Sequence, residues 1–80
     1  MNTKLLPPDP EEMNDDRAEW AQVALDAFAH VTGMDTAGED DETVLGDLLC
    51  DIMHWCDRNG VSFAVTMETA RVHYDAETQP

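Results

Sequence analysis

The chain has 80 residues, of which 18 are acidic and only four are lysine or arginine, so its formal net charge is -14. Phosphate binding requires a basic face, which four cations cannot build. This excludes direct contact with nucleic acid and disfavours anionic membranes. A chain of this length forms one small domain whose thin core leaves little room for an enzyme pocket.

Residues 1–8 are predicted to form a flexible leader, because Pro7 and Pro8 lack backbone donors and have restricted dihedral angles. The same prolines end the segment from Met1 to Leu6 before the core of a signal peptide can form. No apolar run approaches the roughly 20 residues that span a bilayer. We therefore expect the protein in the cytoplasm.

The first predicted helix covers about residues 10–32. Asp9 followed by Pro10 and Glu12 has the form of a capping box, although Asn14 and Asp15 offer a second possible start. Apolar residues then recur with helical spacing, and Gly33 is predicted to end the helix, with His30 in its last turn. The apolar stripe consists of Trp20, Val23, Ala24, Ala27, Phe28 and Val31.

The second and third helices are predicted over about 41–58 and 62–76, separated by a turn at Asn59–Ser62. Gly60 is placed to end one helix in a left-handed conformation, and Ser62 is a natural N-cap for the next. The second helix carries an apolar stripe opposite Asp47 and Asp51. Thr36, Asp40 or Asp41 can cap the N-terminus of this second helix. The stripe comprises Leu45, Leu48, Leu49, Ile52, Trp55 and Cys56.

These elements predict an all-α fold, a small three-helix domain over 9–76 with an αα-hairpin and a frayed tail at 77–80. The third helix carries Phe63, Met67, Ala70 and Tyr74 in register. Short links between helices favour antiparallel neighbours. The aromatic residues are expected to form the core, namely Trp20, Phe28, Trp55, Phe63 and Tyr74.

The chain offers few residues for catalysis or metal binding. Cys50, Asp51 and His54 share spacings seen in some metal sites of helical bundles, and Cys56 and His73 are further candidate ligands. No closely spaced ligand pairs of the zinc-site type are present, and neither cysteine lies where its thiol would be activated. The two cysteines are too far apart on one helix to form a disulfide. We expect no enzyme activity, metal or cofactor.

The acidic residues are the strongest candidate for function. Carboxylates one helical turn apart, such as Asp47 and Asp51, are separated by roughly 5–6 Å, a spacing comparable to neighbouring phosphates of a nucleic-acid strand. A rigid helical surface can therefore present negative charge much as DNA does. The alternative is that the acids serve solubility alone. The predicted partner-binding residues are Glu11, Glu12, Asp15, Asp16, Glu19, Glu39, Asp40, Asp41, Glu42, Asp47 and Asp51.

The segment LLCDIMHWCDRNGVSFAVTMETARVHYDAE resembles small proteins carried by phages and prophages of proteobacteria. The resemblance lies in an acidic helix with Met53-His54-Trp55, the turn at Asn59-Gly60-Val61, Phe63, and the Ala-Arg-x-His-Tyr motif from Ala70 to Tyr74 that ends the segment. In size, charge and setting the chain is similar to the anti-CRISPR inhibitors among such proteins. Several of those inhibitors imitate DNA and occupy the basic DNA-binding surfaces of type I Cascade effectors.

The resemblance and the charge together imply a non-enzymatic inhibitor that blocks DNA binding by occupying the basic channel of a CRISPR effector. No inhibitor motif maps residue by residue, so the eleven acidic positions come from charge placement alone. The alternative is a self-associating helical adaptor or regulatory protein whose acidity serves solubility only. A homodimer is compatible with both the inhibitor and the adaptor hypothesis.

Overall fold

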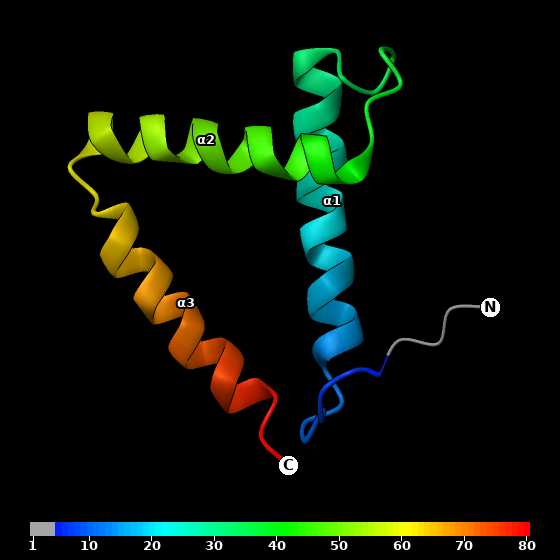
Figure 1. Ribbon diagram of the computed structural model, residues 1–80, viewed down its shortest axis with the longest axis vertical. Coiled ribbons are helices and arrows are strands. Elements are labelled where there is room, and N and C mark those ends of the chain that lie inside the picture. Colours follow the sequence, from blue (N-terminus) through cyan, green and yellow to red (C-terminus); the bar gives the residue numbers. More distant parts are fainter. Residues whose placement is uncertain (1–4) are drawn as a thin grey trace.

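The computed structural model describes residues 5–80 and contains three helices (Figure 1). They are α1 (Asn14–Thr32), α2 (Asp41–Asn59) and α3 (Phe63–Glu77), and no strand occurs among the described residues. The predicted all-α, three-helix fold is confirmed. None of the helices within 5–80 has the length and apolar character needed to cross a bilayer.

Helix α1 begins four residues later than the predicted start at residue 10. The backbone N–H of Glu12 donates to the Asp9 carbonyl at 3.1 Å, and Glu12 has a left-handed φ of 56°, which interrupts a helix. Asp9 nevertheless acts near the helix start, because its carboxylate accepts hydrogen bonds from the N–H groups of Met13 and Asn14. The capping acid was identified correctly, but a turn separates it from the helix.

The ends of α1 and α2 and the starts of α2 and α3 follow the predicted signals. Gly33 and Gly60 end α1 and α2 with φ of 77° and 67°, values that glycine adopts without strain. Asp40 caps α2 by accepting from the N–H of Thr43 at 2.8 Å. Ser62 caps α3 by accepting from the N–H of Val65 at 3.2 Å. Local sequence chemistry thus fixes where these helices begin and end.

The helices enclose an open triangle rather than a packed bundle (Figure 1). Helix α2 lies across α1, and α3 leaves the turn at Gly60 and diverges from α2 as it runs towards the start of α1. The radius of gyration is 14.9 Å, compared with roughly 12 Å for a compact domain of this length. The expectation that short links give antiparallel neighbours is therefore wrong for α1 and α2.

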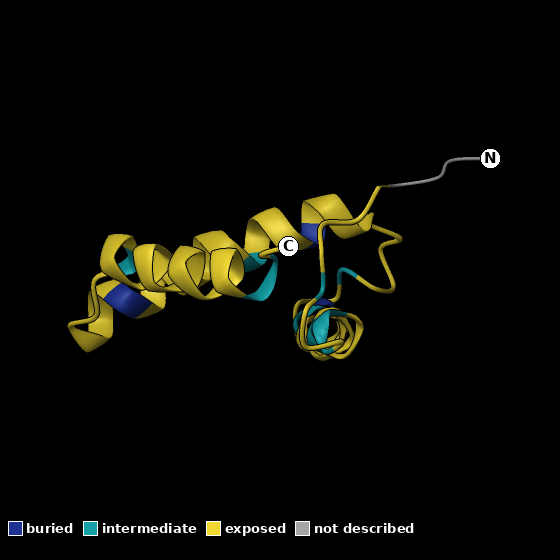
Figure 2. Ribbon diagram, turned by 90° about the horizontal axis from the view of Figure 1, so that it is seen from below, coloured by how far each residue is buried: buried dark blue, intermediate teal, exposed yellow. Residues whose placement is uncertain are grey.

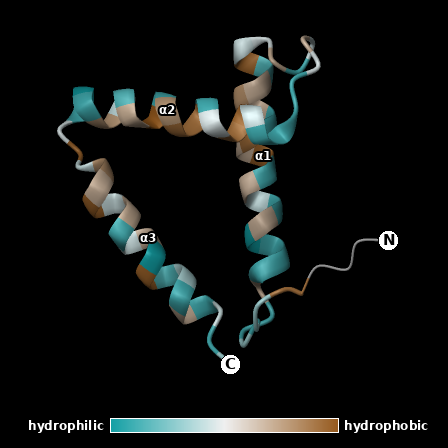
Figure 3. Ribbon diagram, in the orientation of Figure 1, coloured by the Kyte–Doolittle hydropathy of each residue, from teal (hydrophilic) through white to brown (hydrophobic). Residues whose placement is uncertain are grey.

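The predicted aromatic core does not form. Within residues 5–80 only Ala29, Val44 and Cys56 are buried, whereas Trp20 is 61% exposed and Trp55 57% exposed (Figure 2). Helices that cross steeply touch only near the crossing point, so the apolar stripes beyond it remain in solvent. Figure 3 shows such hydrophobic segments along all three helices. Tyr74 is likewise 50% exposed, and Phe28 and Phe63 are half-buried.

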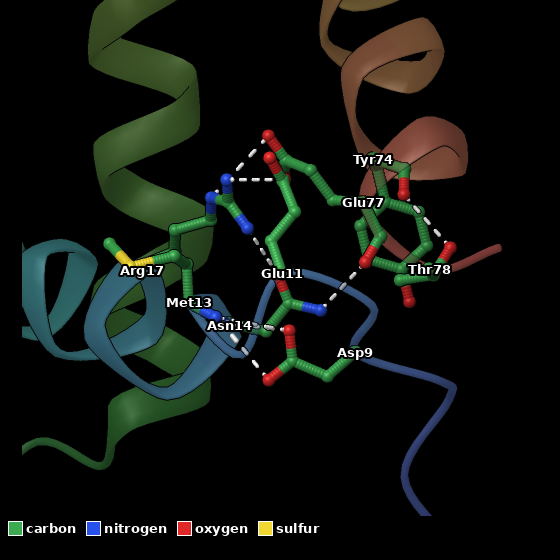
Figure 4. A network of polar contacts seen from close by, with 8 residues as sticks. All are labelled: Asp9, Glu11, Met13, Asn14, Arg17, Tyr74, Glu77 and Thr78. Atoms are coloured by element: carbon green, nitrogen blue, oxygen red, sulfur yellow. Dashed lines mark hydrogen bonds and ion pairs between the residues drawn. The ribbon is translucent and has the colours of Figure 1, made fainter. Parts of the chain in front are cut away.

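The end of α3 is tied to the start of α1, which closes the triangle (Figure 4). The side-chain amide of Asn14 donates to the Glu77 carbonyl at 2.9 Å, and the Arg17 Nε lies 3.4 Å from the Glu77 carboxylate. Thr78 donates from its hydroxyl to the Tyr74 carbonyl at 2.8 Å. Glu77 and Thr78, which were expected to belong to a frayed tail, are instead half-buried and hydrogen-bonded.

The cap at Ser62 yields a stability prediction. We expect Ser62→Ala to lower the free energy of unfolding by about 1 kcal/mol, because the N–H of Val65 loses its acceptor. Thr66→Ala is the matched control within the same helix. It should leave stability unchanged or slightly raised, since alanine has the higher helix propensity. Chemical denaturation at one protein concentration measures both, and equal effects would contradict a capping role for Ser62.

Candidate functional site

All eleven predicted acidic residues are exposed, but the structure divides them into two groups. One group surrounds the start of α1, and the other belongs to the N-terminal half of α2. Glu19, the member of the first group farthest along α1, lies ten residues, or roughly 15 Å, from Ala29, the buried residue of that helix. We call Glu11, Glu12, Asp15, Asp16 and Glu19 the α1 acidic cluster. We call Glu39, Asp40, Asp41, Glu42, Asp47 and Asp51 the α2 acidic surface.

One member of the α1 acidic cluster, Glu11, joins the network of Arg17 that links the start of α1 to the end of α3 (Figure 4). Arg17 Nη2 lies 3.0 Å from the Glu11 carboxylate, while Arg17 Nη1 donates to the Asn14 side-chain oxygen at 2.7 Å. The same guanidinium pairs with Glu77 on α3. Glu11 is therefore neutralised within the chain, whereas the ion pairs found in residues 5–80 include none of the other four carboxylates of this cluster.

A hollow of about 370 Å³ lies beside this network, between the leader and the two helix ends. Its walls include Leu6 and Pro7 of the leader, Ala18 of α1 and Tyr74 of α3, together with Arg17. Sequence reasoning missed it because the lining comes from both ends of the chain. Since Arg17 is already engaged by Glu11 and Glu77, the hollow offers few unengaged polar groups for orienting a ligand.

The α2 acidic surface begins at the helix N-terminus, where Asp40 is held ionised. Hydrogen bonding to Thr43 lowers the pKa of Asp40 below its ordinary value of 3.8. The Thr43 side chain has the larger effect and its backbone N–H the smaller one. The neighbouring carboxylates Glu39, Asp41 and Glu42 lie at the positive end of the helix dipole, which favours negative charge there. The run of four acids is thus compatible with a stable helix start.

Farther along α2 the carboxylates continue on one face. Asp40, Asp47 and Asp51 share a helix face because their spacings of seven and four residues are close to whole turns. The span from Asp40 to Asp51 is roughly 16 Å, at about 1.5 Å per residue. No ion pair within residues 5–80 involves any of the six carboxylates. These charges are therefore available to a partner.

Other acidic residues are engaged in local pairs that were not predicted as site residues. The Asp35 carboxylate lies 3.1 Å from His30 Nδ1, and the hydrogen bond from His30 lowers the pKa of Asp35. Asp75 pairs with Arg71 at 3.1 Å, one helical turn away. The helical spacing of Arg71 and Asp75 was a usable signal for that pair. The Arg17–Glu77 pair joins distant parts of the chain and left no local signal.

The candidate metal ligands do not come together. Across residues 5–80 no group of three or more histidine, cysteine or acidic side chains is close enough to hold a metal ion. Cys50 is an exposed free thiol and Cys56 a buried one. Cys56 lies near the α2–α3 turn, where it accepts the Val61 N–H at its carbonyl.

No family model, curated protein or solved structure matches this chain. The arrangement of its own residues therefore carries the functional argument. The α2 acidic surface is the feature with a clear chemical capability: a row of exposed, unpaired carboxylates on a rigid helix binds lysine and arginine side chains.

The cap at Asp40 gives a pH prediction. A carboxyl whose pKa is lower in the folded state stabilises the fold above its unfolded pKa, and this contribution is lost as the pH falls through the folded value. Wild type should therefore gain stability relative to Asp40→Asn between low pH and neutrality. Asp41→Asn removes one charge without removing the cap, and so measures the effect of charge alone. Denaturation curves from pH 2 to 7 test this, and parallel pH profiles for wild type and Asp40→Asn would contradict it.

Proposed function

We propose that this chain is a non-enzymatic binding protein that occupies the basic nucleic-acid-binding surface of another protein. The observation that supports this most directly is the α2 acidic surface, whose six exposed carboxylates have no cationic partner within residues 5–80. A coat of acids that served solubility alone would not require them to gather on half of one helix.

The charge of the whole chain supports the same proposal. At -14 on 80 residues, the protein attracts a basic partner over long range and speeds the encounter. Asp47 and Asp51 present charges one helical turn apart, much as successive phosphates do. Because a helix holds them in place, little conformational freedom is lost when lysines or arginines of the partner bind.

For the partner we propose the DNA-binding channel of a type I Cascade effector. This rests on a resemblance to phage proteins and on the chemistry of such channels. The resemblance lies in Met53-His54-Trp55, the turn at Gly60 and the motif from Ala70 to Tyr74. CRISPR effectors hold nucleic acid in positively charged channels through its backbone rather than its sequence. A helix carrying backbone-like charge suits such a channel, and its binding there would exclude target DNA.

The test compares two double variants that change the net charge equally. Asp47→Lys/Asp51→Lys alters the α2 acidic surface, and Asp26→Lys/Glu68→Lys alters exposed acids elsewhere on α1 and α3. We expect the α2 variant to weaken binding to purified Cascade about tenfold more than the control, because attraction at the contact becomes repulsion. Wild-type affinity should fall steeply as salt rises, and wild type should displace target DNA.

Three results would count against the proposal: no binding to Cascade at low salt, binding that is indifferent to salt, or equal losses in the two double variants. Equal losses would show that net charge alone governs binding, without a role for the α2 acidic surface. Circular dichroism of both variants checks that their helices are intact.

A further inference from the structure

The chain exposes far more surface than a folded protein of its size. Its accessible surface is 6622 Å², whereas a compact monomer of 8.9 kDa exposes about 4,800 Å². The excess is roughly 1,800 Å². The extended segment 5–8 contributes only part of it, because large apolar side chains on all three helices are also exposed. Soluble monomers rarely expose contiguous apolar patches larger than a few hundred Å².

The exposed apolar residues of α2 and α3 form two continuous stripes. On α2 the stripe contains Leu45, Leu49 and Ile52, which are 45%, 38% and 36% exposed. On α3 it contains Met67 and Tyr74, which are 47% and 50% exposed and lie within one helix face together with Ala70. These are the residues whose pattern predicted the inside of a hairpin. In the open triangle both stripes are covered only in part by the rest of the chain.

We propose that a second copy of this chain covers these stripes, forming a two-fold symmetric homodimer in which α2 and α3 of one copy pack on α3 and α2 of the other. A two-fold arrangement suits the surface because each copy offers the same pair of stripes and receives them in return. Burying the excess of both copies would remove at most about 3,600 Å² from water, since segment 5–8 contributes part of that excess; this upper bound lies within the range of roughly 2,000–5,000 Å² found for obligate homodimers.

The charge distribution permits this contact despite the repulsion between two acidic chains. Asp47 lies about 160° around α2 from Leu45, and Asp51 lies on the same polar side. Asp41 and Glu42 lie about one turn before Leu45, at the end of the α2 stripe, so in the dimer they would lie at the edge of the contact while Asp47 and Asp51 remain on its outer side. Asp47 and Asp51 and the dimer contact thus use opposite sides of one helix, and the dimer does not depend on the proposed function.

The two contacts have opposite salt dependences. Salt screens the repulsion between chains of charge -14, so dimerisation should strengthen as salt rises. Binding of the α2 acidic surface to a basic partner should weaken over the same range. Failure of one proposal is therefore distinguishable from failure of the other.

The test is sedimentation velocity of the full chain over a range of protein and salt concentrations, with two variants of α3. We expect wild type to approach twice the chain mass of 8.9 kDa, and more readily at high salt. Met67→Glu should raise the dimer dissociation constant at least about 100-fold, because it buries an unpaired charge. Val72→Glu is the matched control. It adds the same charge at a position that is 68% exposed and on the opposite side of α3, and it should leave the dimer intact.

If circular dichroism shows that a variant has lost its helices, the wild-type measurement still decides the proposal. Ile52→Glu provides a second probe, on α2. A mass of 8.9 kDa at every concentration and salt would overturn the dimer and leave the stripes to a different protein. A series of larger species, a dimer weakened by salt, or equal effects of Met67→Glu and Val72→Glu would also overturn it.

Discussion

The contact between α1 and α2, which cross each other in Figure 1, is the constraint on which the rest of the structure depends. Ala29 of α1 and Val44 of α2 are buried, and they are two of the three buried residues within 5–80. Because α2 lies across α1, its apolar stripe extends past the contact into solvent. The tie from Asn14 and Arg17 to Glu77 then fixes the far end of α3 at the start of α1. The α1–α2 contact and this tie together keep the three helices apart as the sides of a triangle.

The sequence predicted the local features of this fold well and its assembly poorly. Gly33, Gly60 and Ser62 act through their immediate neighbours, so their roles as helix ends and caps could be inferred from spacing alone. The angle between α1 and α2 depends on which side chains meet across the chain, and an apolar stripe shows only that a face seeks a partner. The bond from Asn14 to Glu77 joins residues 63 positions apart and has no local signature. The exposure of the six α2 carboxylates was predictable, whereas the pairing of Glu11 with Arg17 was not.

The separation of charged and apolar faces on α2 links the two proposals. Helix α2 presents Asp47 and Asp51 on one side and leucine and isoleucine on the other, and the open triangle leaves both sides accessible. In a dimer the apolar sides would be covered and two acidic surfaces would face outward. The charge available to a basic partner would then be doubled, which raises the effective strength of binding if the partner offers two basic sites.

The most direct test of the central claim, that one chain leaves its apolar stripes uncovered, is acrylamide quenching of tryptophan fluorescence in dilute solution where sedimentation shows a monomer. Trp20 and Trp55 are each more than half exposed. The variants Trp55→Phe and Trp20→Phe report on the two residues separately. The open arrangement predicts that both tryptophans are quenched nearly as readily as in the unfolded chain. Strong shielding of both residues in the folded monomer would contradict it, because it would require a packed core within a single chain.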